Sequence, residues 1–175
     1  MSESRVPSFG VFLSRIQSPA LRAVAQHWNE MRGTNKLPSW KDLSPPNPSP
    51  HFKKLWGFQY DDKDKEFRGW FAGDRLRKWV GPPFEGGRLR DLAPPSNYEQ
   101  LLKYLTKVIS VPQIQRTSGH LFATDGLFVS GERIALPMAQ DGRIADGVFG
   151  ASDYISPPLL GPAELIYENV EWYAI

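Results

Sequence analysis

The chain has 175 residues, of which 41% are apolar and 23% charged, proportions typical of one globular domain with a real core. It contains no cysteine, which excludes a disulfide framework, a thiol nucleophile and a cysteine-based metal site. A net charge of +2 is too small to indicate a nucleic-acid or membrane partner by itself. We find no secretory leader pattern and no run near the roughly 18 apolar residues of a membrane span, so we expect a cytoplasmic protein without membrane contact.

The first predicted element is an amphipathic helix over residues 19–32, which follows a flexible N-terminus at residues 1–17. Ser18 is a suitable N-cap, Pro19 suits the first helical position, and Gly33 provides the stop. The apolar face of this helix must be covered by something. We expect it either to form the seam of a homodimer or to cover the protein's own sheet. The side chains on this face are Leu21, Val24, Trp28 and Met31.

A β-hairpin is predicted after a proline-rich connector at residues 34–50. Strands at residues 55–60 and 66–73 flank the charged stretch DDKDK, which lacks the calcium-loop pattern and is predicted to be a polar turn. A helical turn with Leu76 and Trp79 facing inward comes next. The glycine-rich stretch GPPFEGGRLRDL then lacks the GK[ST] ending of a phosphate-binding loop, so we interpret it as a loop with tight turns.

The most clearly predicted helix covers roughly residues 97–110. Ser96 and Glu99 have the spacing of a capping box, and Pro112 ends the helix. One or two strands follow within residues 113–130. The C-terminal extension at 156–175 is expected to contain another strand or a docked segment.

Between these elements, Asp141-Gly142 lies between two apolar runs and predicts a two-residue hairpin turn. In that register Leu136 pairs with Gly147, which leaves space above the sheet for a helix, a ring or a ligand. Pro137 cannot donate a ladder hydrogen bond, so it predicts a bulge or a locally shortened neighbouring strand. The inner face of this hairpin would carry Ile134, Leu136, Met138, Ala145 and Phe149.

The order of these elements predicts an α+β fold for residues 18–155. We expect a five-stranded antiparallel sheet with helices on one face, in addition to the N-terminal amphipathic helix. This order of two strands, short helices, a longer helix and three antiparallel strands resembles the PAS arrangement.

Four stretches of sequence carry a resemblance to small single-domain PAS proteins of alphaproteobacteria. They are HWNEMRGTNKLPSW at 27–40, FRGWFAGDRL at 67–76, GPPFEGGRLRDL at 81–92 and IALPMAQDGRIADGVFGA at 134–151. The resemblance implies a PAS-like sensory or regulatory domain that binds a small ligand or a partner protein. It specifies neither ligand nor reaction. No output domain fits in the short C-terminal extension, so we expect a signalling protein in trans, or an adaptor role.

The cofactors common in PAS proteins fit this sequence poorly. A covalent flavin photosensor needs a cysteine and is excluded, and noncovalent flavin binding has no motif here. Haem is not favoured, because the predicted long helix contains no histidine. Of His27, His51 and His120, the last is the best candidate ligand, but a local hydrogen-bonding role explains it more simply. We predict no metal site, and the cofactor remains unknown.

A small organic ligand is the remaining option for a PAS-like fold. Its pocket would be mostly apolar and would lie between the sheet and the long helix. The same side chains could equally fill the core of a ligand-free interaction module, and the sequence leaves both interpretations open. The candidate lining residues are Phe58, Trp70, Leu76, Trp79, Leu92, Tyr104, Leu136, Met138 and Phe149.

Catalysis and nucleic-acid binding are not favoured. Ser118, His120, Asp125 and Ser130 lie close in sequence, but no nucleophile elbow surrounds them, so we do not expect an enzyme. Residues 68–90 mix arginines with aromatic residues, yet the chain shows no nucleic-acid-binding signature. We interpret this stretch as solvated surface or a protein-partner patch.

Overall fold

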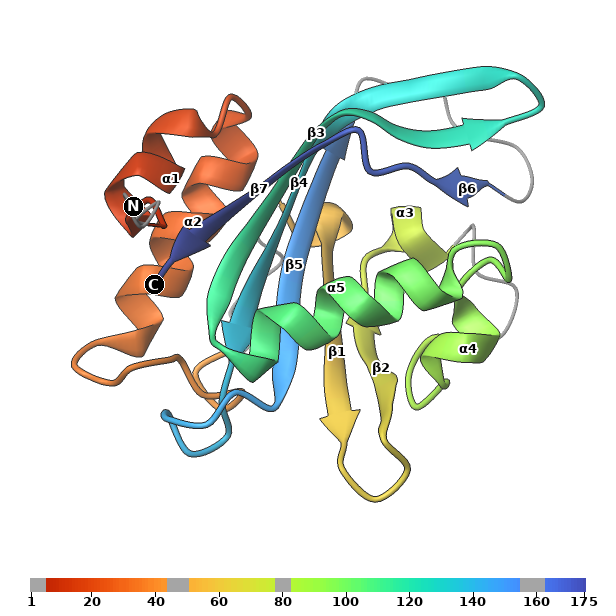
Figure 1. Ribbon diagram of the computed structural model, residues 1–175. Coiled ribbons are helices and arrows are strands. Elements are labelled where there is room, and N and C mark those ends of the chain that lie inside the picture. Colours follow the sequence, from red (N-terminus) through yellow and green to blue (C-terminus); the bar gives the residue numbers. More distant parts are fainter. Residues whose placement is uncertain (1–5, 44–50, 78–82, 155–162) are drawn as a thin grey trace, which may run out of the picture.

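The computed structural model describes residues 6–43, 51–77, 83–154 and 163–175, so the expectations for residues 44–50 and for Trp79 lie outside the described residues. Its centre is a seven-stranded antiparallel sheet in the order β2-β1-β5-β4-β3-β6, with β7 also paired to β3 (Figure 1). The helices are α1 (Phe9–Arg15), α2 (Pro19–Arg32), the 3-10 helix η1 (Phe52–Lys54), α3 (Asp74–Arg77), α4 (Leu89–Leu92) and α5 (Tyr98–Ser110). The strands are β1 (Leu55–Asp61), β2 (Glu66–Ala72), β3 (Gln113–Thr124), β4 (Leu127–Met138), β5 (Gly147–Tyr154), β6 (Glu164–Leu165) and β7 (Asn169–Ala174).

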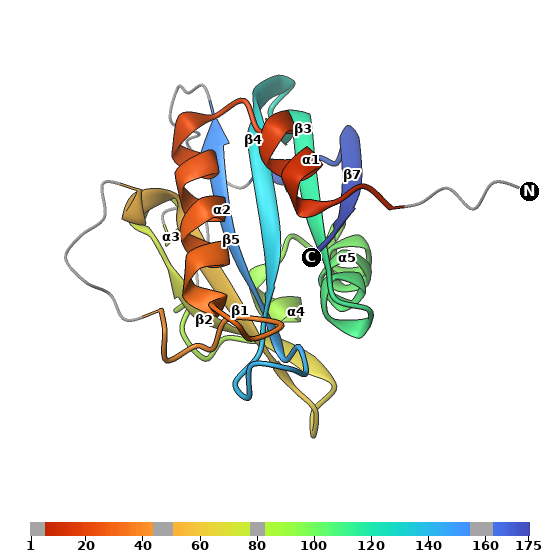
Figure 2. The same cartoon turned by 90° about the vertical axis from the view of Figure 1, so that its left-hand side faces the viewer.

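Helices cover both faces of the sheet, which corrects the expected cover on one face. Helices α1 and α2 lie on one side, and α4 and α5 lie on the other (Figures 1 and 2). The physical reason is the apolar run IALPM in β4, in which successive side chains point to opposite faces. Both faces are therefore apolar, and each needs its own cover.

Residues 9–15 form a helix within the segment that is predicted to be flexible. Helix α1 places Phe12 in the core, and Ile16 directly after the helix is buried as well. The ring centroid of Phe12 lies 5.3 Å from that of Tyr173 in β7. Contact with a strand far away in sequence stabilises this seven-residue helix, which is too short to be stable alone.

Helix α2 covers the protein's own sheet, which is the second of the two expectations for its apolar face, and these residues are not free to form a dimer seam. Leu21, Val24 and Trp28 are buried against β4 and β5, and Met31 packs at the edge of the same cluster. The Trp28 Nε1 donates to the carbonyl oxygen of Pro137 at 3.0 Å. The apolar face of α2 is therefore covered within the chain and is not available to a second copy.

The connection between β4 and β5 is longer than the predicted two-residue turn. Met138 pairs with Gly147 and Leu136 with Phe149, which shifts the register by two residues from the expected one. The Asp141 side chain instead accepts hydrogen bonds from the backbone N–H groups of Arg143 and Ile144, both at 2.8 Å. A shift of two residues keeps every side chain on its predicted face.

Pro137 lies where one ladder has already ended. Pairing between β3 and β4 stops at Gln115 and Ala135, while the β4–β5 ladder continues through Pro137 without a bulge. The Met138 carbonyl oxygen accepts from Asp146 on the β5 side, so the ring of Pro137 interrupts no bond there. The predicted bulge is absent, and β3 itself continues to Gln113 through its pairing with β7, so only the β3–β4 pairing is shortened near Pro137.

The C-terminal extension enlarges the sheet, with β6 and β7 both paired to β3. The predicted capping box at the start of α5 is wrong. Asn97 is the N-cap residue, and its side-chain amide pairs with the backbone N–H and carbonyl of Leu165, both at 2.8 Å. This reciprocal pair ties the start of α5 to β6.

Candidate functional site

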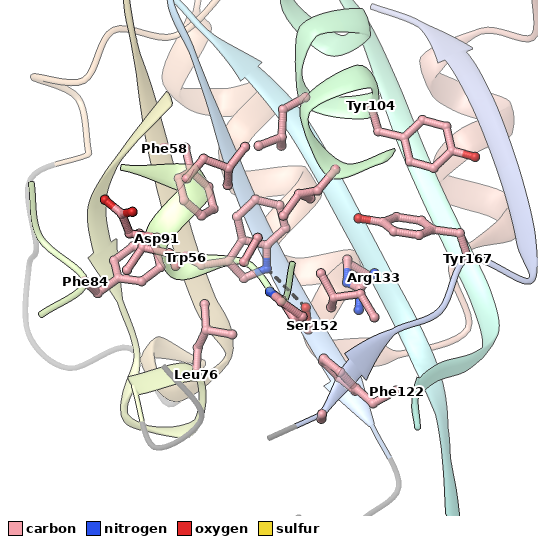
Figure 3. A pocket seen from close by; sticks show the side chains of 18 of the residues that line it. Trp56, Phe58, Leu76, Phe84, Asp91, Tyr104, Phe122, Arg133, Ser152 and Tyr167 are labelled. Atoms are coloured by element: carbon pink, nitrogen blue, oxygen red, sulfur yellow. Dashed lines mark hydrogen bonds between the residues drawn. The ribbon is translucent and has the colours of Figure 1, made fainter. Parts of the chain in front are cut away.

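A cavity of about 270 Å³ lies between the sheet and the layer formed by α4 and α5 (Figure 3). Its lining is mostly apolar, with a few polar groups, which is the usual composition of a small-molecule site. The lining residues are Trp56, Phe58, Leu76, Phe84, Leu89, Asp91, Leu92, Ala93, Pro94, Pro95, Leu101, Tyr104, Leu105, Gln115, Phe122, Arg133, Ser152, Ala163, Leu165 and Tyr167.

One side of the cavity is aromatic. The ring of Trp56 lies against the backbone of Gly150, where a Cβ atom would overlap the indole, so only glycine fits at this position of β5. The Trp56 Nε1 donates to Ser152 Oγ at 3.1 Å, which fixes the orientation of the ring. Phe58 continues this wall, with ring centroids 6.0 Å from Trp56 and 5.1 Å from Phe84.

The other side of the cavity carries a buried cation. Arg133 is 6% exposed, and its guanidinium carbon lies 5.2 Å from the ring centroid of Phe122 and 5.3 Å from that of Tyr167. Its Nη2 donates to the Leu121 carbonyl oxygen at 3.3 Å, and the guanidinium also interacts with the Tyr167 side chain. Nη1 has no partner within hydrogen-bonding geometry. Burial lowers the pKa of Arg133 and raises the pKa of Tyr167. Gln115, on the adjacent strand, is also buried, with its Nε2 unpartnered.

The structure brings together four of the nine predicted lining residues: Phe58, Leu76, Leu92 and Tyr104. Trp79 lies outside the described residues. The remaining four, Trp70, Leu136, Met138 and Phe149, belong to the cluster under α1 and α2 on the opposite face of the sheet. Their expected place beside the cavity is therefore wrong, because the alternation of a strand separates them from the face that α5 covers.

The space predicted above Gly147 is real but is not part of the cavity. The indole of Trp40 fills it, since a Cβ atom on Gly147 would overlap this ring. The Trp40 Nε1 donates to Asp146 Oδ1 at 2.8 Å. Of the three predicted occupants, a helix, a ring or a ligand, the structure has a ring.

Sequence reasoning missed the polar lining residues Gln115, Arg133 and Ser152. One signal was readable: Arg133 is a charged residue that directly precedes the apolar run IALPM of a central strand. A charged side chain in such a place is almost never buried unless it is paired.

A profile described as PAS domain matches residues 16–152, most of the chain. The chain belongs to the PAS domain family. Membership in this family indicates a sensory or regulatory domain. Comparison with curated proteins finds no match for this PAS domain. The matched range leaves α1, β6 and β7 outside it.

On the face opposite the cavity, the PAS domain holds a buried network at the start of α2. Arg116 donates from Nη2 to Glu132 at 2.9 Å and from Nη1 to Glu171 at 2.6 Å. Glu132 also accepts from the backbone N–H groups of Gln17, at 2.9 Å, and Ser18, at 3.5 Å. The network therefore connects β3, β4 and β7 to the N-terminal end of α2.

Glu171 and Tyr173 form the outer part of this network. The Tyr173 hydroxyl donates to Glu171 Oε2 at 2.8 Å. Burial alone would raise the pKa of Glu171, but the hydrogen bonds from Arg116 and Tyr173 outweigh it, so this pKa lies below its usual value. Burial and the hydrogen bond to Glu171 raise the pKa of Tyr173 to about 12.

A raised phenol pKa makes stability depend on alkaline pH. Neutral Tyr173 contributes stability that is fully present below about pH 10, its ordinary pKa, and is lost as pH rises through about 12. We expect the free energy of unfolding to fall less steeply between pH 10 and 12 in Tyr173→Phe than in the wild type. Urea denaturation at pH 9, 10, 11 and 12 measures both slopes. Equal slopes in the two proteins would contradict the expectation.

The other candidate residues of this PAS domain do not come together as a metal or nucleic-acid site in the described part of the chain. His120 Nδ1 lies 3.4 Å from Glu168, and the described ranges contain no cluster of three or more groups that could hold a metal ion. The arginines of the 68–90 stretch that are described in full form ion pairs with carboxylates, for example Arg90 with Glu66 at 2.7 Å and Arg88 with Asp91 at 3.0 Å. Among the described residues, no helix is long and apolar enough to cross a membrane.

Proposed function

We propose that this PAS domain binds a small organic molecule in the cavity between the sheet and α5. In this role it is a sensory or regulatory module whose state is read by a signalling protein in trans. The proposal assigns it a binding role and no catalytic one. The resemblance to alphaproteobacterial single-domain proteins, the cytoplasmic location and the homodimer stay predictions.

The cavity itself is the observation that supports ligand binding. Protein interiors are close-packed, and voids larger than a water molecule are few. The space of about 270 Å³ under α5 is much larger than a water molecule, and two of the residues that line it, Gln115 and Arg133, each have a side-chain donor without a partner. Both features fit a site whose occupant completes the packing and the hydrogen bonding.

A ligand-free interaction module is the second candidate. Leu127 and Phe128, at the tip of the β3–β4 hairpin, are 65% and 59% exposed, and exposed apolar side chains of this size are found where partner proteins bind. Such a module would also act through a partner protein, but it would not respond to a small molecule.

A substitution that fills the cavity distinguishes the ligand-binding function from the ligand-free interaction module. Leu101 lines the cavity from α5, so Leu101→Trp should place an indole inside it, whereas Lys103→Trp adds the same group on the exposed side of the helix. We expect at least one compound of a metabolite library, at 100 times its Kd, to raise the Tm of the wild type by about 5 °C or more. Lys103→Trp should keep this response, and Leu101→Trp should lose it.

The same screen can reject the proposal. If no metabolite shifts the Tm of the wild type and native mass spectrometry shows no bound small molecule, the ligand-free module is the better function. A response that survives in Leu101→Trp would place the binding site elsewhere in the chain.

A further inference from the structure

We infer that the ligand is an organic anion whose carboxylate binds Arg133 and Gln115 while its apolar body packs against Trp56 and Phe58. This inference rests on the proposed function and deepens it by naming the chemical class of the ligand. It is carried by the pairing of one buried cation with an apolar cavity.

The charge of Arg133 is uncompensated within the described residues. The side chain lies between two aromatic rings, and no carboxylate forms an ion pair with it in the described ranges. Arginine stays protonated in proteins, and a buried charge is costly unless it is paired. The depressed pKa of Arg133, caused by burial, agrees with a cation that lacks an anionic partner.

Arg116 provides an internal comparison. It is 5% exposed, close to the 6% of Arg133, and it lies one strand away on the opposite face of the same sheet. Two carboxylates bind it, Glu132 at 2.9 Å and Glu171 at 2.6 Å. Arg116 therefore has two carboxylate partners, whereas Arg133, which lines the cavity, has none among the described residues.

Gln115 supplies a second donor to the same place. In the β3–β4 ladder Thr117 is opposite Arg133 and Gln115 is opposite Ala135, so Gln115 and Arg133 share a face on adjacent strands. The unpartnered Nη1 of Arg133 and Nε2 of Gln115 both belong to residues that line the cavity. Two donors from neighbouring strands suit the two oxygens of a carboxylate.

The cavity contains little that would repel an anion. Asp91 is the one acidic residue among the described lining residues, and it forms an ion pair with Arg88 at 3.0 Å. In Figure 3 Asp91 lies on the side of Phe58 and Phe84, whereas Arg133 lies on the side of Ser152 and Tyr167. The negative charge and the unpaired positive charge are therefore at different ends of the cavity.

The size of the cavity limits the apolar body. A cavity of about 150 Å³ is enough for benzene. The space of about 270 Å³ here accommodates an aromatic ring or a medium-length alkyl chain together with a carboxylate. Aromatic and medium-chain carboxylic acids are the chemical class that fits both the shape and the charge.

Isothermal titration calorimetry with matched acids and amides tests the inference. The probes are the six- to ten-carbon alkanoates and 3-phenylpropionate, each compared with its primary amide. We expect the best acid to bind the wild type at least about tenfold more tightly than its amide, the effect of one charge-assisted hydrogen bond. Arg133→Met should remove this preference, whereas Arg143→Met, at an exposed loop position, should preserve it.

The test of a carboxylate ligand does not depend on Arg133→Met alone. The acid–amide comparison uses the wild type, and Gln115→Leu is a second variant, expected to weaken the best acid about threefold. Equal binding of acids and amides, or binding of amides only, would overturn the inference and leave the proposed function intact. The same conclusion would follow if no acid of the panel bound while the metabolite screen found only neutral ligands. If no acid of the panel bound and the metabolite screen found no ligand, both the inference and the proposed function would be overturned.

Discussion

Trp28→Ala is expected to lower the free energy of unfolding by about 3–5 kcal/mol, the usual cost of removing a fully buried tryptophan. Trp28 is 0% exposed and packs between α2 and the sheet. Its Nε1 is also the group that satisfies the Pro137 carbonyl oxygen next to the end of the β3–β4 ladder. The alanine variant therefore loses apolar contacts and leaves a buried acceptor unpaired.

Guanidinium chloride denaturation followed by far-UV circular dichroism measures this change. His27→Ala is the matched control, because His27 is the exposed neighbour on the same helix and should change stability by no more than about 0.5 kcal/mol. Trp28→Phe keeps most of the packing and should lie between the two. Similar stabilities for Trp28→Ala and His27→Ala would show that α2 is not part of the cooperative core.

Glu132→Gln is expected to destabilise the protein by about 3 kcal/mol. Breaking a buried ion pair usually costs about 3–5 kcal/mol, and we expect the lower end because Glu171 still compensates Arg116. The glutamine also presents only one acceptor oxygen, while Glu132 accepts from Arg116 and from the backbone of Gln17 and Ser18. The loss should therefore affect α2 as well as the sheet.

Hydrogen exchange of the α2 amides, together with denaturant titration, tests this prediction. Asp62→Asn is the control, because it removes one charge from the exposed pair with Lys65 and should cost no more than about 1 kcal/mol. We expect faster exchange in α2 of Glu132→Gln and not in Asp62→Asn. Equal stability of the two variants would mean that the network does not anchor the helix.

The sequence predicted those helices and strands whose own residues show a clear pattern of apolar and polar positions. The β1–β2 hairpin, α2 and α5 lie close to their predicted positions, because period-2 and period-3.6 patterns report directly on an exposed and a buried side. Helix α1 was missed, since its stability comes from Phe12 packing on Tyr173, more than 150 residues away in sequence.

The side of the sheet on which the cavity lies could not be predicted in the same way. The hairpin face with Leu136, Met138 and Phe149 was identified correctly, but both faces of β4 are apolar, and the pattern does not say which helix covers which face. A cavity is the volume that remains after side chains pack, so the type of a single residue does not indicate where it lies. Arg133 is the exception, because a charge in a central strand indicates an unusual environment.

Two consecutive rungs of the β4–β5 ladder face different layers of the molecule. Arg133 pairs with Ser152 on the cavity side, and Glu132 pairs with Asp153 on the side where both carboxylates accept hydrogen bonds from the start of α2. One rigid peptide unit, about 3.3 Å of strand, separates these rungs. A single peptide bond therefore joins a residue that lines the cavity to a residue that accepts hydrogen bonds from the N-terminal end of α2.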